Sequence, residues 1–333
     1  MPCAPVVILP FARPNNLVQV LAQVRVAAPQ ILYIGSDGPR EGRPDDVELI
    51  AQVRAVVADQ VDWDCDVRRI CRERNLGVQG NAELTLDAVF AEVATAIVLD
   101  DDCVPDPSFF RFCTELLERY ADDQRIMHIA GCNEEIDSRK FDGLSYAFTA
   151  FGSNWGWATW ARAWQAHRTV FARPHDDTTE LVWFGRPATR FMPVAGPRDF
   201  RPVRHDLQTR SGRAFFADVA EGKDHSLAEW GQQWRLSVLN LGGLAITPAT
   251  NMIENVGFAP GSDSHLPERV MKTASATTFP LRHPPRVEVQ PAVERALERN
   301  IVRAVGRLAR RFRRHTPAVL KGPARRLASI LVR

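Results

Sequence analysis

The sequence of 333 residues lacks the two features that would direct a chain into or across a membrane. It has no run of about 18 consecutive apolar residues, which argues against an ordinary membrane-spanning helix. Residues 1–5 carry no charged segment followed by a long apolar one, so we expect no secretory signal. These absences favour a cytoplasmic protein.

Cysteine is sparse, and its spacing does not form a metal-binding or disulfide framework. The six cysteines are scattered over the first half of the chain without paired C-x-x-C spacing: Cys3, Cys65, Cys71, Cys103, Cys113 and Cys132. We therefore predict reduced thiols that act mostly as small core side chains.

Net charge is low overall but unevenly distributed. Residues 282–333 contain 14 Lys or Arg and three Glu, a net charge of +11, which leaves −9 for residues 1–281 out of a total of +2. Hydrophobic residues make up 45% of the chain, so the body is globular, and its length suits one large α/β domain with additions or two ordinary domains.

The most informative stretch is residues 96–107. Four apolar residues of strand type run directly into Asp100, Asp101 and Asp102, and Pro105 and Pro107 oppose a regular continuation. Three adjacent carboxylates at the end of a buried strand repel one another unless a cation or basic groups offset the charge. The pattern indicates a divalent metal that holds a phosphorylated ligand. The alternative is a solvated acidic turn in which Asp106 caps a helix beginning near Ser108.

The N-terminal half alternates short apolar runs with amphipathic segments. We predict strands at 5–9, 31–34, 67–71 and 96–99, with helices at about 15–24, 47–57 and 81–92 between them, the first capped by Asn15 or Asn16. This order indicates a parallel sheet wound in βαβ units. Polar residues follow every strand, at Arg13, 36–38, Asn75 and 100–102, and in such a sheet they line one cleft.

Tryptophan is concentrated beyond a further predicted strand at 126–131. Trp155, Trp157, Trp160 and Trp164 account for four of the eight tryptophans. Trp155 and Trp157 flank a glycine and are predicted to form a sugar-stacking surface, whereas Trp160 and Trp164 have helical spacing that suits core packing equally well. The composition and weak periodicity of residues 172–215 predict a long loop with little regular structure. After it we predict a helix from Ala228 and a last strand at 245–248.

Six motifs together resemble a known group of enzymes. The sequence LDDDCVPDPSFF at 99–110 resembles the acidic metal-binding motif of GT-A fold nucleotide-sugar glycosyltransferases. The order of motifs resembles bacterial family 2-like transferases and the N-acetylglucosaminyltransferase I group, over about residues 5–266. The other five motifs are 11–14, 36–38, 74–77, 156–160 and 255–258 with His265.

The resemblance implies roles for individual residues. It implies that the nucleotide pocket is lined by Pro10, Phe11, Arg13, Asp37 and Arg74. In this pocket Asp37 would face the base or ribose, and Arg74 would approach the nucleotide or its phosphates. It further implies that Asp100 and Asp101 frame the ribose, that Asp102 ligates Mn²⁺ or Mg²⁺, and that His265 supports the metal or diphosphate.

An inverting transfer also needs a carboxylate base that takes the proton of the acceptor hydroxyl. In relatives this base stands near a segment that corresponds to residues 228–234, where Trp230 is a further candidate for acceptor binding. We select Glu229 as the base and Asp224 as second choice. Gly231 departs from the pattern because some relatives carry Asp there, and helix capping is an equal alternative role for Glu229.

The basic C-terminal segment has helical spacing. Apolar residues recur from Val293 to Phe312, and arginines recur between them. Such a helix suits an anionic membrane surface; the alternatives are packing on the body with a solvated basic face and, with lower rank, nucleic-acid binding.

Together these features predict an α/β, GT-A type domain with a mainly parallel central sheet flanked by helices. Its predicted parts are a nucleotide-sugar-binding half at 1–132, an acceptor-binding and catalytic half at 133–281, and a basic amphipathic helical tail at 282–333. The predicted enzyme moves sugar from a nucleoside-diphosphate sugar, foremost a UDP-sugar, to a saccharide or lipid-linked saccharide in surface polysaccharide or glycolipid synthesis. We expect it at the inner face of a membrane and expect no nucleic acid partner.

Two alternatives stay open. One is a nucleotidyltransferase that makes nucleotide sugars, although residues 10–14 lack the glycine-rich phosphate loop of that class. The other is a carbohydrate-binding or membrane-binding module that has kept the fold and lost turnover; the intact Asp triplet argues against it.

Overall fold

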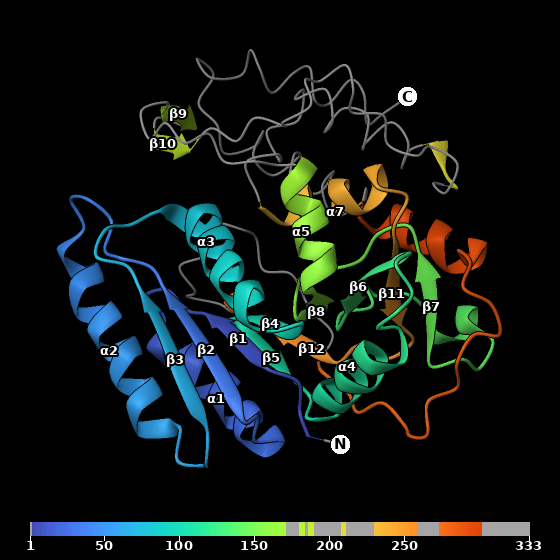
Figure 1. Cartoon of the computed structure of the whole chain (residues 1–333), viewed down its shortest axis with the longest axis horizontal. Helices are drawn as coiled ribbons and strands as arrows, with labels where there is room; N and C mark the ends of the chain where they lie inside the picture. Colours follow the sequence, from blue (N-terminus) through green and yellow to red (C-terminus); the bar gives the residue numbers. More distant parts are fainter. Residues whose placement is uncertain are drawn as a thin grey trace.

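The computed structural model describes residues 2–170, 180–183, 186–189, 208–210, 230–258 and 273–301. Its centre is an eight-stranded sheet with the order β3-β2-β1-β4-β8-β6-β11-β7 (Figure 1). The strands are β1 (Val6–Leu9), β2 (Ile31–Ser36), β3 (Asp66–Cys71), β4 (Thr95–Asp100), β6 (Ile126–Ala130), β7 (Tyr146–Thr149), β8 (Trp157–Trp160) and β11 (Leu244–Pro248). Only β7 and β8 run against the other six, so the predicted mainly parallel α/β sheet is confirmed.

Helices cover both faces of the sheet because neighbouring residues of its strands point to opposite sides. Val6 and Ile8 of β1 belong to the core under α1, α2 and α4, whereas Val7 belongs to the core under α3, α5 and α7 (Figure 1). These helices are α1 (Pro14–Ala27), α2 (Pro44–Gln60), α3 (Gly77–Glu92), α4 (Ser108–Arg119), α5 (Ala161–Val170) and α7 (Trp230–Asn240).

Two helices begin at other residues than predicted, because a proline and a hydrogen-bonded loop determine where they start. Helix α1 begins at Pro14, whose fixed φ suits a first helical position, so neither Asn15 nor Asn16 is the cap. Helix α3 begins at Gly77, four residues before the predicted Asn81, because the loop before it donates hydrogen bonds to the carboxylate of Asp37. Asp106 does accept from the backbone N–H and hydroxyl of Ser108 at the start of α4, as the capping alternative expected.

Smaller elements complete the described chain. Within the predicted loop at 172–215, β9 (Glu180–Trp183) and β10 (Arg186–Thr189) pair antiparallel, so this part contains regular structure. Strand β5 (Cys103–Pro105) pairs with β12 (Ile253–Asn255), and short 3₁₀ turns occupy η1 (Ser138–Phe141) and η3 (Val256–Phe258). No helix in the described ranges is both long and apolar enough to span a bilayer.

The first helical part of the basic segment, residues 291–301, packs on the body. Val293, Leu297 and Ile301 are buried with Leu236 and Leu239 of α7 in one apolar cluster. The side chain of Glu294 is fully buried and accepts a hydrogen bond from the backbone N–H of Ala150 at 2.8 Å. The apolar face of this stretch is therefore covered by protein; residues 302–333 lie outside the described residues.

Candidate functional site

The Asp triplet lies where the winding of the sheet reverses. The chain runs outward from β1 to β2 and β3, and then returns to place β4 on the other side of β1. At such a reversal the loops after the two central strands diverge and leave a crevice at the carboxyl edge of the sheet. The loop after β1 contains Arg13, and the turn after β4 contains Asp101 and Asp102, so the two loops meet at this edge.

The three carboxylates have different environments. Asp101 is fully buried; its Oδ2 accepts from the backbone N–H of Phe11 at 2.7 Å, and its Oδ1 lies 2.7 Å from Nη2 of Arg13. Asp102 keeps 14% of its side chain exposed and lies 2.6 Å from Nη1 of Arg13 through Oδ2. Asp100 is half-buried. Arg13 thus binds two of the three carboxylates with separate nitrogens.

A distant segment completes the site by pairing with β5. Asn255 lies opposite Cys103 in the β5–β12 ladder, and the backbone N–H of Val256 donates to the carbonyl of Asp102 at 2.8 Å. The amide of Asn255 lies 3.5 Å from Oδ1 of Asp102. Gly257 comes so close that a Cβ there would overlap Oδ2 of Asp102. Glycine at 257 therefore lets the carboxylate of Asp102 lie directly against the backbone.

The electrostatics are those of an acidic site that lacks enough positive charge. Burial raises the pKa of Asp100, and the neighbouring Asp102 and Asp101 raise it further. Burial also raises the pKa of Asp101, against the lowering effect of Arg13. For Arg13 itself, burial disfavours the charged form, but Asp101 and Asp102 outweigh it and raise its pKa. One guanidinium does not neutralise three carboxylates, so an added cation would stabilise the site.

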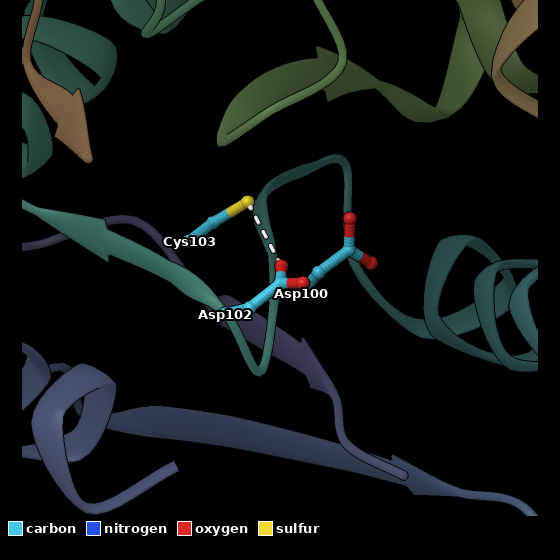
Figure 2. Close-up of side chains that lie close together, drawn as sticks. All are labelled: Asp100, Asp102 and Cys103. Carbon is cyan, nitrogen blue, oxygen red and sulfur yellow. Dashed lines mark hydrogen bonds between the residues drawn. The ribbon is translucent and has the colours of Figure 1, made fainter. Parts of the chain in front are cut away.

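The donor atoms fit a hard divalent ion. Among the described residues, one group of potential ligands comes together: Asp100, Asp102 and Cys103, with ligand atoms within 4.8 Å of one another. Figure 2 shows the Asp102 carboxylate between the Cys103 sulfur and the Asp100 side chain. Burial raises the pKa of the Cys103 thiol, which donates to Oδ1 of Asp102 at 3.6 Å and so stays protonated. Carboxylate oxygens from Asp100 and Asp102 suit Mn²⁺ or Mg²⁺.

Asp37, which is predicted to face the base or ribose, binds the loop after β3. It is 3% exposed, and its carboxylate accepts from the backbone N–H groups of Gly38 and Leu76, both at 2.9 Å, and from Nδ2 of Asn75 at 3.0 Å. Burial raises the pKa of Asp37, against these hydrogen bonds. Asp37 therefore holds the loop after β3 against the end of β2.

The remaining predicted pocket residues line the loops at this edge. Phe11 is half-buried and lies under the guanidinium of Arg40, 5.2 Å from its ring centre. Pro10 is buried, and Arg74 is exposed. Asp101 cannot frame a ribose because its carboxylate is enclosed by Phe11 and Arg13. Arg40, which was not among the predictions, thus lies over Phe11 while its guanidinium pairs with the buried Asp46.

The predicted acceptor surface is wrong for Trp157. This residue is 1% exposed because β8 inserts between β4 and β6, and its ring stacks on His128 at 5.4 Å and packs on Trp234. Trp155 is half-buried against the main core and keeps part of its surface accessible. Trp160 and Trp164 are buried, as core packing expects.

Several predicted residues lie outside the described residues. These are the two candidate bases Glu229 and Asp224, the side chain of Trp230, and His265. Gly231 is described, and a Cβ at this position would overlap the amide of Asn154. The space beside α7 that an aspartate would enter is therefore filled by Asn154.

A strained loop at the same edge was missed from the sequence. Glu134 and Glu135 follow β6 with φ of 50° and 60°, in the left-handed region that side chains with a Cβ rarely adopt. Asn133 donates to the carbonyls of Ile136 and Ala249, and Asn300 donates to the carbonyl of Glu134 at 2.7 Å. Strain of this kind persists only where surrounding contacts hold it, and it clusters at functional sites.

Comparisons with known proteins are weak. No family model and no curated protein sequence matches the chain. Among solved structures, it is similar to a galactosyltransferase LgtC in complex with donor and acceptor sugar analogs, with 16% identity and a TM-score of 0.30 over 48% of this chain and 59% of that one. It is also similar to a UDP-glucose pyrophosphorylase complexed with UDP-glucose, with 14% identity and a TM-score of 0.26 over 45% of this chain and 63% of that one. The chain spans about three fifths of either structure, and the scores are too low to support an argument about function.

Proposed function

We propose that this protein is a metal-dependent, inverting glycosyltransferase that moves a sugar from a nucleoside-diphosphate sugar to a saccharide or lipid-linked saccharide. One observation carries the proposal: Asp100 and Asp102 lie beside Arg13 at the reversal point of the sheet, and the carboxylate of Asp102 lies against the backbone of Gly257. An acidic ligand set next to arginine is suited to a divalent ion together with a diphosphate. The carboxylates would bind the positive metal ion, and the arginine and the metal ion would together balance the negative diphosphate. The motif order described above agrees with this assignment.

The chain's own residues would divide the work as follows. Asp100 and Asp102 would hold Mn²⁺ or Mg²⁺, which supplies positive charge to a leaving diphosphate. Arg13 and the exposed Arg74 would bind phosphate oxygens, and Phe11 would pack against the nucleoside under Arg40. Asp37 would act indirectly by fixing the loop that carries Arg74. Glu229 and Asp224 remain the proposed bases for the acceptor hydroxyl, and His265 a proposed metal or diphosphate ligand.

A nucleotide screen tests the donor site. We expect one nucleoside diphosphate among UDP, GDP, dTDP and ADP, or CMP, to raise the melting temperature only with Mn²⁺, because a ligand of the folded state stabilises it by mass action. Asp102→Asn should abolish the shift. Asp66→Asn is the matched control, since Asp66 is an exposed carboxylate at the start of β3, away from the carboxyl edge. Absence of any metal-dependent shift would reject the donor site and favour a binding module.

Product analysis separates the two enzyme classes. A glycosyltransferase releases nucleoside diphosphate from its donor sugar, whereas a nucleotidyltransferase forms pyrophosphate from a nucleoside triphosphate and a sugar phosphate. We expect slow, Mn²⁺-dependent release of nucleoside diphosphate that Asp102→Asn removes. Pyrophosphate release instead would assign the protein to the second class.

We further propose that residues 302–333 bring the enzyme to an anionic membrane surface. The apolar face of 291–301 is already buried, so the membrane contact would have to come from the following arginine-rich residues. Vesicles with about a third anionic lipid should sediment the full chain, and neutral vesicles should not. A chain ending at 301 that sediments equally well would reject this role.

A further inference from the structure

In the part of the triplet site that the structure describes, Arg13 forms ion pairs with both the buried Asp101 and the partly exposed Asp102. Its Nη2 lies 2.7 Å from Oδ1 of Asp101, and its Nη1 lies 2.6 Å from Oδ2 of Asp102. The two contacts differ in accessibility. Asp101 is fully buried and is also bound by the N–H of Phe11, whereas Asp102 is partly exposed. A cation from solvent can therefore reach Asp102 but not Asp101.

Arg13 is able to release one contact and keep the other. Its backbone is fixed, because its carbonyl accepts the first hydrogen bond of α1 from Leu17 at 3.1 Å. Its side chain is 32% exposed, so its outer end has room to turn. The other partners of Asp102 are weak: the amide of Asn255 at 3.5 Å and the thiol of Cys103 at 3.6 Å. Among the side-chain contacts of Asp102 with described residues, Arg13 thus supplies the short one that would compete with a metal for this carboxylate.

A guanidinium and a divalent ion repel each other across a shared carboxylate. The repulsion ends when an anion such as a diphosphate lies between them and accepts hydrogen bonds from the freed Nη1. Binding of the cation and binding of the anion then favour each other. The anion relieves the repulsion between Arg13 and the cation, and the cation frees Arg13 from Asp102 so that it can bind the anion.

We propose that Arg13 is an internal counter-ion. In the free protein it pairs with Asp102, and when the metal binds it leaves this carboxylate and binds the diphosphate of the donor instead. This inference concerns regulation of the site proposed above and rests on that proposed function. Arg13 would keep the empty site from taking up metal ions alone, and it would couple metal uptake to the presence of donor.

The proposal makes a prediction that a purely structural role does not. Arg13→Gln should bind Mn²⁺ alone more tightly than the unchanged protein, by about tenfold, because the competing contact is gone. The same variant should lose most of the additional stabilisation that nucleoside diphosphate gives in the presence of Mn²⁺. The free Mn²⁺ concentration is measured by its electron paramagnetic resonance signal during titration, and thermal shift reports the nucleotide.

A second variant protects the test against misfolding. Arg13→Gln leaves the buried Asp101 without its charged partner, so the pair Arg13→Gln with Asp101→Asn is made as well; it removes both charges and leaves the net charge at the site unchanged. Arg25→Gln is the matched control, since Arg25 lies in α1, the helix that follows Arg13, is 57% exposed, and pairs with Asp62. We expect both Arg13 variants to gain Mn²⁺ affinity and the control to be unchanged.

The outcomes separate the two proposals. If the Arg13 variants bind Mn²⁺ as weakly as the unchanged protein, or more weakly, while Asp102→Asn still abolishes binding, the counter-ion role is overturned and the metal site stands. If Mn²⁺ binding is missing in every protein, or is insensitive to Asp102→Asn, the metal site fails, and the proposed function fails with it.

Discussion

The indole nitrogen of Trp234 donates a hydrogen bond to Nδ1 of His128 at 2.9 Å. Since Nδ1 accepts, the proton of the neutral imidazole is on Nε2, which donates to the carbonyl of Ser153, also at 2.9 Å. The pair connects α7 to β6 and to the loop before β8, beneath the carboxyl edge of the sheet. The position of α7 relative to the site therefore depends on an uncharged histidine.

Acidification is expected to destabilise the fold below about pH 6.5. Burial lowers the pKa of both His128 and His167 to about 3. Because an unfolded histidine titrates near 6.5, the unfolded chain binds more protons than the folded one between these values, and stability falls as pH drops through this window. We expect a loss of about 1–2 kcal/mol per histidine between pH 7 and pH 5, measured by urea unfolding. A histidine Hε1 resonance of either residue that titrates near pH 6.5 in the folded protein would contradict this.

Asp100→Asn is expected to make the metal-free protein more stable. Burial and the adjacent carboxylates raise the pKa of Asp100, so its folded-state value exceeds the unfolded one and the charged site loses stability as pH rises. Removing this charge should add about 1–2 kcal/mol at pH 8, a gain that shrinks at lower pH. Thermal unfolding with a chelator present measures it. The same variant should lose its response to Mn²⁺; a destabilised apo variant would show that the charge is already compensated.

Gly257→Ala tests whether the metal site needs the Asp102 carboxylate to lie against the backbone at residue 257. A Cβ at 257 would overlap Oδ2 of Asp102 and lie 3.1 Å from Nη1 of Arg13, so the carboxylate must turn away from its present position. We expect the Mn²⁺-dependent thermal shift to fall by most of its value, with at most about 1–2 kcal/mol lost from the apo protein.

Gly42→Ala is the matched control for that substitution. Gly42 has a φ of +70° and open space around its missing Cβ, so alanine there introduces backbone strain of about 1 kcal/mol without touching the site. Its metal response should remain that of the unchanged protein. Equal Mn²⁺-dependent thermal shifts in the two alanine variants would show that the metal site does not need glycine at 257.

The strand-end carboxylates were predictable because the signal is local: four apolar residues followed by three Asp can hardly be a helix interior. Which of these carboxylates is buried and which is accessible could not be predicted, since this depends on contacts with Arg13 and Phe11, about 90 residues away in the sequence. For the same reason Asn255 and Gly257 reach Asp102 only through the pairing of β12 with β5.

Trp157 shows a second limit of sequence reasoning. Aromatic residues around a glycine have the same appearance in a ligand-binding loop and at the start of a central strand. Only the insertion of β8 between β4 and β6, a long-range pairing, decides that the Trp157 ring is buried. Asp37 shows the same limit: a carboxylate after a strand suits a ligand, and only the long-range contacts with Asn75 and Leu76 show that it also holds the loop after β3.

Two truncations test the contribution of the first part of the basic segment. Ending the chain at 290 removes Val293, Leu297 and Ile301 from the apolar cluster under α7, and it removes the Glu294 hydrogen bond to Ala150. Burial of each large side chain contributes about 1.5–3 kcal/mol, so the loss rivals the whole stability of an ordinary domain. A chain ending at 301 keeps these contacts and should melt within a few degrees of the full protein. Circular dichroism melting compares the two, and equal melting temperatures would show that residues 291–301 do not stabilise the fold.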